Sequence, residues 1–182
     1  IHMLSRHLGV TASDRVAGQH ALNAEYFERI EAINFALAHD DGQNLQGLLA
    51  ADVILLGVSR TSKTPTCVYL ANRGVKAGNI PLVPGMPMPP VLDEIDPVNG
   101  PMVIGLKIGV ERLVQIRSQR LMALNENSIT DYTDEEAVRA EVTEASRLFQ
   151  RRKWAVIDVS RRSVEETAAA ILNKLNQRHQ QE

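Results

Sequence analysis

Aromatic residues and cysteine are scarce in this chain of 182 residues, which is 4% aromatic and has one cysteine. So few aromatic rings argue against a surface on which nucleic-acid bases stack. A single cysteine cannot form an internal disulfide, which fits a reducing compartment. The net charge of −2 shows no large excess of one sign, so it does not indicate binding to nucleic acid or to an acidic membrane surface.

Long hydrophobic runs are missing as well. No apolar stretch is long enough to span a bilayer, and the first residues do not follow a signal-peptide pattern. These absences lead us to expect a cytoplasmic protein whose partners include neither nucleic acid nor membrane.

The hydrophobic content of 44% is sufficient for one domain with a full core. Ile1-His2-Met3 is typical of residues left by cloning. We therefore expect residues 1–18 to comprise a tag remnant and an N-terminal loop, and residues 19–182 to form the folded domain.

Residues 51–71 follow the order of a strand, a glycine and a helix. Val53–Leu56 is an uninterrupted apolar run, which is typical of a strand covered on both faces. Gly57 follows it, and Lys63 and Thr64 then open a segment whose apolar residues recur at helical spacing. A strand, a glycine turn, Lys-Thr and a helix in this order predict a phosphate-binding P-loop.

In a P-loop, the main-chain N–H groups of the turn and the N-terminus of the helix surround an anion. Lys63 would reach the β- or γ-phosphate of a nucleotide, and the Thr64 hydroxyl would bind magnesium. The general pattern has glycine where this chain has Ser62, and glycine adopts positive φ more readily than serine does. An ordinary strand, turn and helix with an exposed Lys-Thr pair is therefore the alternative.

Six segments of the chain together carry a more specific pattern. They are Gln19-His20, His39–Gly42, Gly57–Thr66, Tyr69–Ala71, Asn79–Val83 and Ser163–Glu166. This pattern resembles the bifunctional kinase/pyrophosphorylase regulatory proteins of pyruvate, phosphate dikinase and of phosphoenolpyruvate synthetase. In that family a serine at position 62 is a normal variant. The family also carries an additional N-terminal domain that has no counterpart in this chain.

The resemblance implies two opposed activities in one site. In one, ADP donates a phosphoryl group to a threonine of the dikinase or the synthetase, which inactivates that enzyme. In the other, inorganic phosphate removes the same group, which yields pyrophosphate and restores activity. Mg²⁺ would arrive with the nucleotide, and the resemblance also allows a homodimer. We favour the dikinase as partner, because Thr61-Ser62 resembles that branch and the synthetase branch more often has Cys-Gly there.

The same resemblance implies roles for individual residues. Lys63 and Arg60 would neutralise phosphate charge, Thr64 would bind magnesium, and Asp41 would activate the incoming hydroxyl. The nucleotide would contact the whole loop, which consists of Gly57, Val58, Ser59, Arg60, Thr61, Ser62, Lys63 and Thr64.

Asp40 and Asp41 are adjacent carboxylates at the predicted end of a helix, just before Gly42. Negative charge is unfavourable there, because the C-terminal end of a helix is the negative pole of its dipole. A solvated turn is the simpler explanation of the pair. In the family resembled, this segment recurs near the nucleotide site, which favours Asp41 as a general base or metal-associated carboxylate and leaves the role of Asp40 open.

Alternating helices and strands are predicted for the rest of the chain. Residues 84–101 hold most of the eight prolines and are expected to be irregular, either as a mobile lid or docking loop or as a rigid surface connection. Helices are predicted from residues 23, 43, 63, 109, 133 and 163, and strands over residues 53–56, 80–83, 102–106 and 154–159. This order predicts a three-layer α/β domain of the P-loop kinase type, with helices on both faces of a mainly parallel sheet.

Two predictions concern side chains of these helices. The helix that Asn23 is expected to cap has an apolar face, formed by Tyr26, Ile30, Ile33 and Leu37. Thr133 and Glu136 have the spacing of a capping box, as do Ser163 and Glu166.

Other polar residues have more than one explanation. Arg117 and Arg120 most simply belong to a solvated helix face, and the alternative is that one of them binds phosphate or the partner. For Asp158, at the end of an apolar strand, we favour a structural or nucleotide-adjacent role over direct metal binding. His20 and His39 lack partners at the spacing that zinc requires.

The residues leave two other functions open. A small-molecule kinase that uses ATP would need a lid and an acceptor pocket within this domain. A nucleotide-responsive binding module would bind the same ligand without catalysis.

Overall fold

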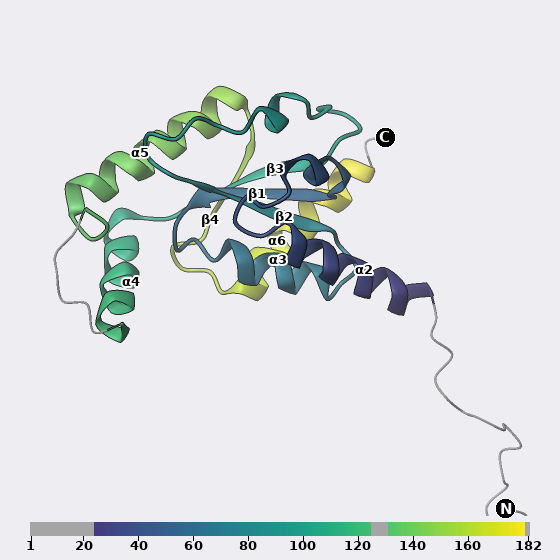
Figure 1. Cartoon of the computed structure of the whole chain (residues 1–182), viewed down its shortest axis with the longest axis horizontal. Helices are drawn as coiled ribbons and strands as arrows, with labels where there is room; N and C mark the ends of the chain where they lie inside the picture. The colour runs from purple at the N-terminus through teal and green to yellow at the C-terminus, as the bar shows by residue number, and fades with distance from the viewer. Residues whose placement is uncertain (1–23, 125–130, 181–182) are drawn as a thin grey trace, which may run out of the picture.

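The computed structural model describes residues 24–124 and 131–180 of the chain. At its centre lies a sheet of four strands in the order β2-β1-β3-β4, and each neighbouring pair is parallel (Figure 1). The strands are β1 (Val53–Val58), β2 (Ala77–Leu82), β3 (Met102–Lys107) and β4 (Ala155–Asp158). The predicted parallel sheet is therefore confirmed.

Helices cover both faces of this sheet (Figure 1). The helices are α2 (Ala24–Ala38), η1 (Leu45–Ala50), α3 (Lys63–Ala71), η2 (Pro90–Asp93), α4 (Val110–Ala123), α5 (Glu135–Arg152) and α6 (Val164–His179), of which η1 and η2 are 3₁₀ helices. One face is covered by α5, which contacts β1 and β3, and α4 packs against α5. The other face is covered by α3, which contacts α2 and α6. The predicted three-layer α/β architecture is confirmed.

β1 lies in the middle of the sheet and is buried along its whole length. After β1 the chain goes to β2 on one side, and it then returns to β3 on the other side. Ligands of open parallel sheets bind beyond the carboxyl ends of the strands at such a reversal of strand order. The end of β1 is therefore where the topology favours a binding site.

The boundaries of several elements differ from the predictions by a few residues. β2 begins at Ala77 and α6 continues to His179, whereas the sequence predicts a later start for β2 and an earlier end for α6. The proline-rich segment 84–101 is irregular apart from η2, as predicted. Val91 and Leu92 are buried in the core, which favours a rigid connection over a mobile lid for this part.

Two side-chain predictions are wrong. The expected apolar face of α2 is largely exposed, since Tyr26 is 37%, Ile30 38% and Leu37 64% exposed, and the buried residues are Ala32 and Ala36. Small side chains allow α2 to approach α3 closely, which the larger apolar residues would prevent.

The second error is at the start of α5. Its N-cap is Asp134, whose carboxylate accepts a hydrogen bond of 2.9 Å from the N–H of Ala137, so Thr133 lies one position too early. The predicted capping box of Ser163 and Glu166 is confirmed.

Some predictions lie outside the described residues. They concern residues 1–18, Gln19, His20 and the cap at Asn23. Within the described ranges, no helix combines the length and the apolar character needed to cross a bilayer.

Candidate functional site

The segment between β1 and α3 forms a tight loop, Ser59–Ser62, followed by Lys63 as the first residue of the helix. Arg60 has φ of +73° and Ser62 has φ of +59°. Ser62 thus adopts the left-handed conformation for which glycine is usual at this position of the general pattern. The N–H groups of Lys63 and Thr64 at the start of α3 have no partner within the helix and can face an anion beyond the loop, whereas Pro65 has no N–H and Thr66 donates to the carbonyl oxygen of Ser62.

Gly57 lies inside β1 and not in the turn, which corrects the prediction that the turn begins there. Because Gly57 has no side chain, Thr61 and the main chain of Leu106 can pack closely against β1. A Cβ at position 57 would lie 2.7 Å from Oγ1 of Thr61 and 3.0 Å from the carbonyl oxygen of Leu106. The Thr61 hydroxyl folds back over the strand and donates a 2.9 Å hydrogen bond to the carbonyl oxygen of Val58.

Replacing Gly57 with alanine should therefore lower the free energy of unfolding by roughly 1–3 kcal/mol, because the added methyl group overpacks the loop against the strand. Urea unfolding measures this change. Combining Gly57→Ala with Thr61→Ala should cost less than the sum of the two single changes, since one of the close contacts is then removed. If the two changes in unfolding free energy are strictly additive, the contact with Thr61 is not what destabilises Gly57→Ala.

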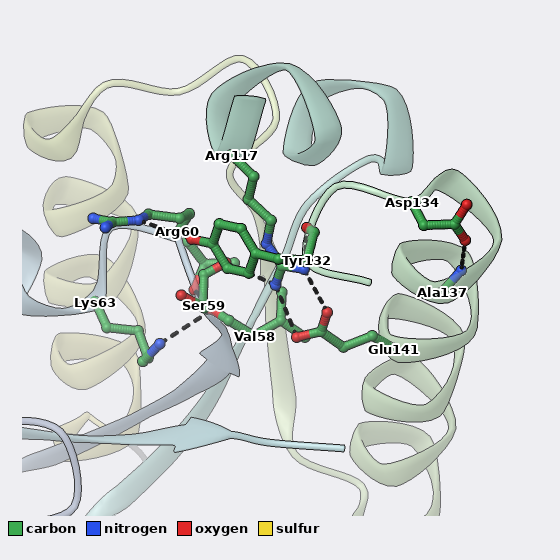
Figure 2. A network of polar contacts seen from close by, with 10 residues as sticks. Val58, Ser59, Arg60, Lys63, Arg117, Tyr132, Asp134, Ala137 and Glu141 are labelled. Atoms are coloured by element: carbon green, nitrogen blue, oxygen red, sulfur yellow. Dashed lines mark hydrogen bonds and ion pairs between the residues drawn. The ribbon is translucent and has the colours of Figure 1, made fainter. Parts of the chain in front are cut away.

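Lys63 is 6% exposed, and its Nζ donates a 3.1 Å hydrogen bond to the carbonyl oxygen of Val58 (Figure 2). Burial lowers the pKa of Lys63, and the nearby carboxylates of Asp41, Asp40 and Glu141 act in the opposite direction. The ammonium group is thus held under the loop with one neutral partner. It is available to an anionic ligand at little cost in lost hydrogen bonds.

Asp40, Thr64 and Asn79 form a second group near Lys63. The Thr64 hydroxyl donates to Oδ1 of Asp40 at 2.7 Å, and Nδ2 of Asn79 donates to the same oxygen at 2.5 Å. The main-chain N–H of Asp41 donates to Oδ1 of Asn79 at 3.2 Å. Asp40 is thereby fixed to the first turn of α3, a role that the sequence left open.

The segment that carries the two aspartates is held by main-chain bonds to β2. The N–H of Asn79 donates to the carbonyl oxygen of His39 at 3.1 Å, and the N–H of Gly42 donates to that of Asn79 at 2.9 Å. Asn79 itself is fully buried. Sequence reasoning missed Asn79 as a site residue, although an amide in an otherwise apolar strand was a signal that could have identified it.

The oxygen atoms of this group fit magnesium. Mg²⁺ prefers hard oxygen ligands and usually keeps several waters, with one or two carboxylates and the phosphates of the substrate completing its shell. Thr64 Oγ1 and the Asp40 carboxylate supply such oxygens side by side. Among the described residues, no three His, Cys, Asp or Glu side chains are grouped so that they could hold a metal ion. Nucleotide phosphate would therefore have to complete the site.

Arg117 of α4 reaches the loop and Glu141 of α5 (Figure 2). It is 2% exposed, and its Nη1 and Nη2 donate to the two carboxylate oxygens of Glu141 at 2.7 and 2.9 Å. Nη2 also donates to the carbonyl oxygen of Ser59 at 3.3 Å. The prediction that Arg117 belongs to a solvated face is wrong, whereas Arg120 is exposed as predicted.

Tyr132 joins Arg117 to Arg60 (Figure 2). Its ring lies 4.5 Å from the guanidinium carbon of Arg117, and its carbonyl oxygen accepts a 3.2 Å hydrogen bond from Nη1 of Arg117. Its hydroxyl accepts a 3.2 Å bond from Nε of Arg60. Arg60 is therefore held at the rim of the loop through its Nε.

Asp158 has a structural environment. Partial burial acts to raise its pKa, but hydrogen bonds from the N–H and hydroxyl of Ser160 outweigh this and hold the pKa below its usual value. The Ser160 hydroxyl also accepts a 2.8 Å bond from the N–H of Gly109. Asp158 thus fixes the turn after β4 against the start of α4.

A cavity of about 310 Å³ opens at the reversal of strand order, beyond the ends of β1, β3 and β4. Four arginines contribute to its walls, namely Arg60, Arg112, Arg161 and Arg162, and no carboxylate does. Ser62 and Ser163, which precede α3 and α6, also line it. Cationic side chains and two helix N-termini make this cavity suitable for an anion.

Comparison with known proteins gives a consistent result. Residues 1–172 match the family model described as kinase/pyrophosphorylase. Three similar proteins carry the provisional name pyruvate, phosphate dikinase regulatory protein. They come from Hyphomonas neptunium (70% identical over 178 residues), Caulobacter vibrioides (57% over 176) and Rhodopseudomonas palustris strain TIE-1 (48% over 182).

These alignments cover 98%, 97% and 100% of this chain but 63%, 55% and 64% of the respective relatives. The chain thus spans somewhat more than half the length of the curated relatives that it matches. Because the family model covers nearly the whole chain, and because the loop, the buried lysine and the Asp40–Thr64 pair agree with a phosphate-binding site, the chain belongs to the kinase/pyrophosphorylase family.

Proposed function

We propose that this chain transfers the β-phosphoryl group of ADP to a threonine of pyruvate, phosphate dikinase and also removes that group with inorganic phosphate. The observation that supports this most is the placement of Lys63, Thr64, Asp40 and Asp41 around one loop at the end of β1. The family match and the printed names of the relatives support the type of reaction and the partner.

ADP would place its diphosphate on the N–H groups of the loop and of the first turn of α3. The arginine-lined cavity at the strand reversal, with Arg60, Arg112 and Arg162 in its walls, would take the α-phosphate end of the diphosphate. Lys63 Nζ, which donates to Val58 in this structure, would turn to the β-phosphate. Thr64 and Asp40 would hold magnesium, which neutralises phosphate charge when bound.

In the kinase direction, the threonine oxygen attacks the β-phosphorus and the bond from that phosphorus to the bridging oxygen breaks, so AMP leaves. Asp41 would accept the hydroxyl proton. In the other direction, an oxygen of inorganic phosphate attacks the phosphorus of phosphothreonine and the bond to the threonine oxygen breaks, which gives pyrophosphate and, after protonation, threonine. Positioning and charge neutralisation would supply most of the rate in both directions.

Asp41→Ala is expected to reduce the kinase direction by roughly 10²-fold or more, the usual contribution of a general base, and to affect the phosphate-dependent direction much less. A threonine hydroxyl must lose a proton to attack, whereas inorganic phosphate is already an anion. Initial rates in the two directions measure the difference. Asp40→Asn is the matched comparison, and it should slow both directions because both use the loop and its metal. An equal loss in both directions for Asp41→Ala would remove Asp41 from the role of base.

The proposed function is tested by incubating the protein with ADP labelled in its β-phosphate and with purified dikinase or synthetase. We expect label on a threonine of the dikinase and its release as pyrophosphate when inorganic phosphate is added. Label on the synthetase instead would show that the synthetase, and not the dikinase, is the protein substrate. Label on neither protein, with turnover of a metabolite in the absence of protein partners, would favour the small-molecule kinase.

A further inference from the structure

A second cavity, of about 330 Å³, lies next to Asp41 on the opposite side of the site. Its walls come from the end of β2, from the proline-rich segment that follows and from α5. Most of its lining is apolar, with Leu82, Met86, Met88, Ala145 and Leu148 among the contributors.

The strand order separates this cavity from the arginine-lined one. The apolar cavity lies on the β2 side of β1, whereas the arginine-lined cavity lies on the side of β3 and β4. Asp41 belongs to the wall of the apolar cavity. Among the charged side chains near Lys63, Asp41 acts on it most strongly. Asp41 therefore lies between the apolar cavity and Lys63 of the loop.

Glu141 connects the apolar cavity to the loop through hydrogen bonds. Its carboxylate binds Arg117, which donates to the carbonyl oxygen of Ser59 in the loop, and Glu141 also lines the apolar cavity. One wall of the cavity is thus fixed to the phosphate-binding loop by hydrogen bonds. A molecule in the cavity would have a defined position relative to the transferred phosphoryl group.

The charges of the apolar cavity are unfavourable for the phosphate groups of a nucleotide. Asp41, Glu141 and Glu144 contribute carboxylates, of which Glu141 is paired with Arg117, and Arg151 is the cation in its wall. Phosphate groups would be repelled by these carboxylates, whereas a neutral or cationic polypeptide would not. Methionine and proline side chains in the wall provide an adaptable surface for apolar side chains.

We propose that this cavity binds the segment of the protein substrate that carries the accepting hydroxyl, with an apolar side chain of the segment inside the cavity and the hydroxyl at Asp41. The proposal rests on the proposed function, because it requires a polypeptide acceptor. It specifies that the acceptor has an apolar residue beside its threonine, and that α5 and the proline-rich segment form the surface that recognises it.

Site-directed crosslinking tests this without relying on catalysis. The only cysteine of the chain, Cys67, is buried, and burial raises its pKa to about 12, so a cysteine introduced at the surface can be labelled selectively. Met86, at the cavity, and Met122, on α4, are both 67% exposed. A photocrosslinker on Met86→Cys should capture the dikinase and attach to the segment that contains the accepting threonine, whereas the same group on Met122→Cys should not.

Kinetics provide the second arm. Leu148→Glu places a carboxylate in the apolar wall and should raise KM for the dikinase by at least about tenfold, with the Kd of ADP unchanged. Gln150→Glu adds the same charge to an exposed position of the same helix, outside the cavity, and should change neither. Arg162→Ala, in the arginine-lined cavity, should raise the Kd of ADP and leave KM for the dikinase unchanged.

The outcomes separate this inference from the proposed function. Label transfer by the wild type, with equal crosslinking from positions 86 and 122 and an unchanged KM in Leu148→Glu, would overturn the cavity assignment and leave the proposed function standing. Loss of ADP binding in Leu148→Glu, when the variant retains its fold, would show that the cavity holds the nucleoside instead. Absence of label transfer by the wild type would count against the proposed function itself.

Discussion

Lys63→Ala is expected to reduce phosphoryl transfer in both directions by roughly 10²–10³-fold, the loss that follows removal of one preorganised group from a developing charge. The physical reason is the position of Lys63. Its ammonium group is buried beneath the loop and has a main-chain carbonyl as its partner, so it can turn to phosphate without breaking an ion pair. Rates of label transfer and of pyrophosphate release measure the effect.

The control for this change is Lys107→Ala. Lys107 lies at the end of β3, is exposed and does not line the arginine-lined cavity, so its loss should alter both rates little. Lys63→Ala should also retain most of its stability, because a single hydrogen bond to Val58 contributes about 1 kcal/mol. Full activity in a folded Lys63→Ala protein would exclude the lysine from phosphate binding.

Arg117→Ala and Glu141→Ala are each expected to lower the free energy of unfolding by about 3–5 kcal/mol, because either change leaves a buried charge without its partner. The guanidinium is 2% exposed and binds both oxygens of Glu141, whose side chain is 11% exposed. Arg117→Ala should further loosen the loop through the lost bond to Ser59 and weaken ADP binding. Urea unfolding and calorimetric titration measure the two effects.

A surface ion pair on α5 provides the comparison. Arg139 and Glu135 are separated by one helical turn, and both side chains are about 60% exposed. Arg139→Ala should cost only about 0.3–0.5 kcal/mol. Replacing Arg117 and Glu141 together with apolar residues should cost less than either single change, since no charge is then left unpaired. A cost for Arg117→Ala no larger than that for Arg139→Ala would contradict its role as the support of the loop.

Local patterns predicted much of the fold. The apolar run of β1 and the Lys-Thr start of α3 are set by nearby residues, and the same holds for the capping box at Ser163. The face of α2 was not predictable in this way. Periodicity identifies where large apolar residues recur, but burial in α2 is decided by how closely α3 approaches, and that contact selects Ala32 and Ala36.

Only the part of the candidate site that is continuous in the sequence could be predicted. The loop and the lysine follow one another in the sequence, so their pattern is visible there. The partners of Arg117 cannot be recognised from the sequence, since Glu141 is 24 residues away along the chain and Ser59 is 58 residues away. Asn79 meets Asp40 across a separation of 39 residues. Such contacts are created by the packing of α4, α5 and β2 around the end of β1, which no local spacing specifies.

A crystal structure of the protein with ADP and Mg²⁺ would test the central claim most directly. We predict that the diphosphate lies on the main-chain N–H groups between Arg60 and Thr64, with Lys63 Nζ on the β-phosphate and the metal beside Thr64 and Asp40. Density for ADP in the apolar cavity beside Leu148, with the loop empty and Lys63 still bonded to Val58, would contradict it.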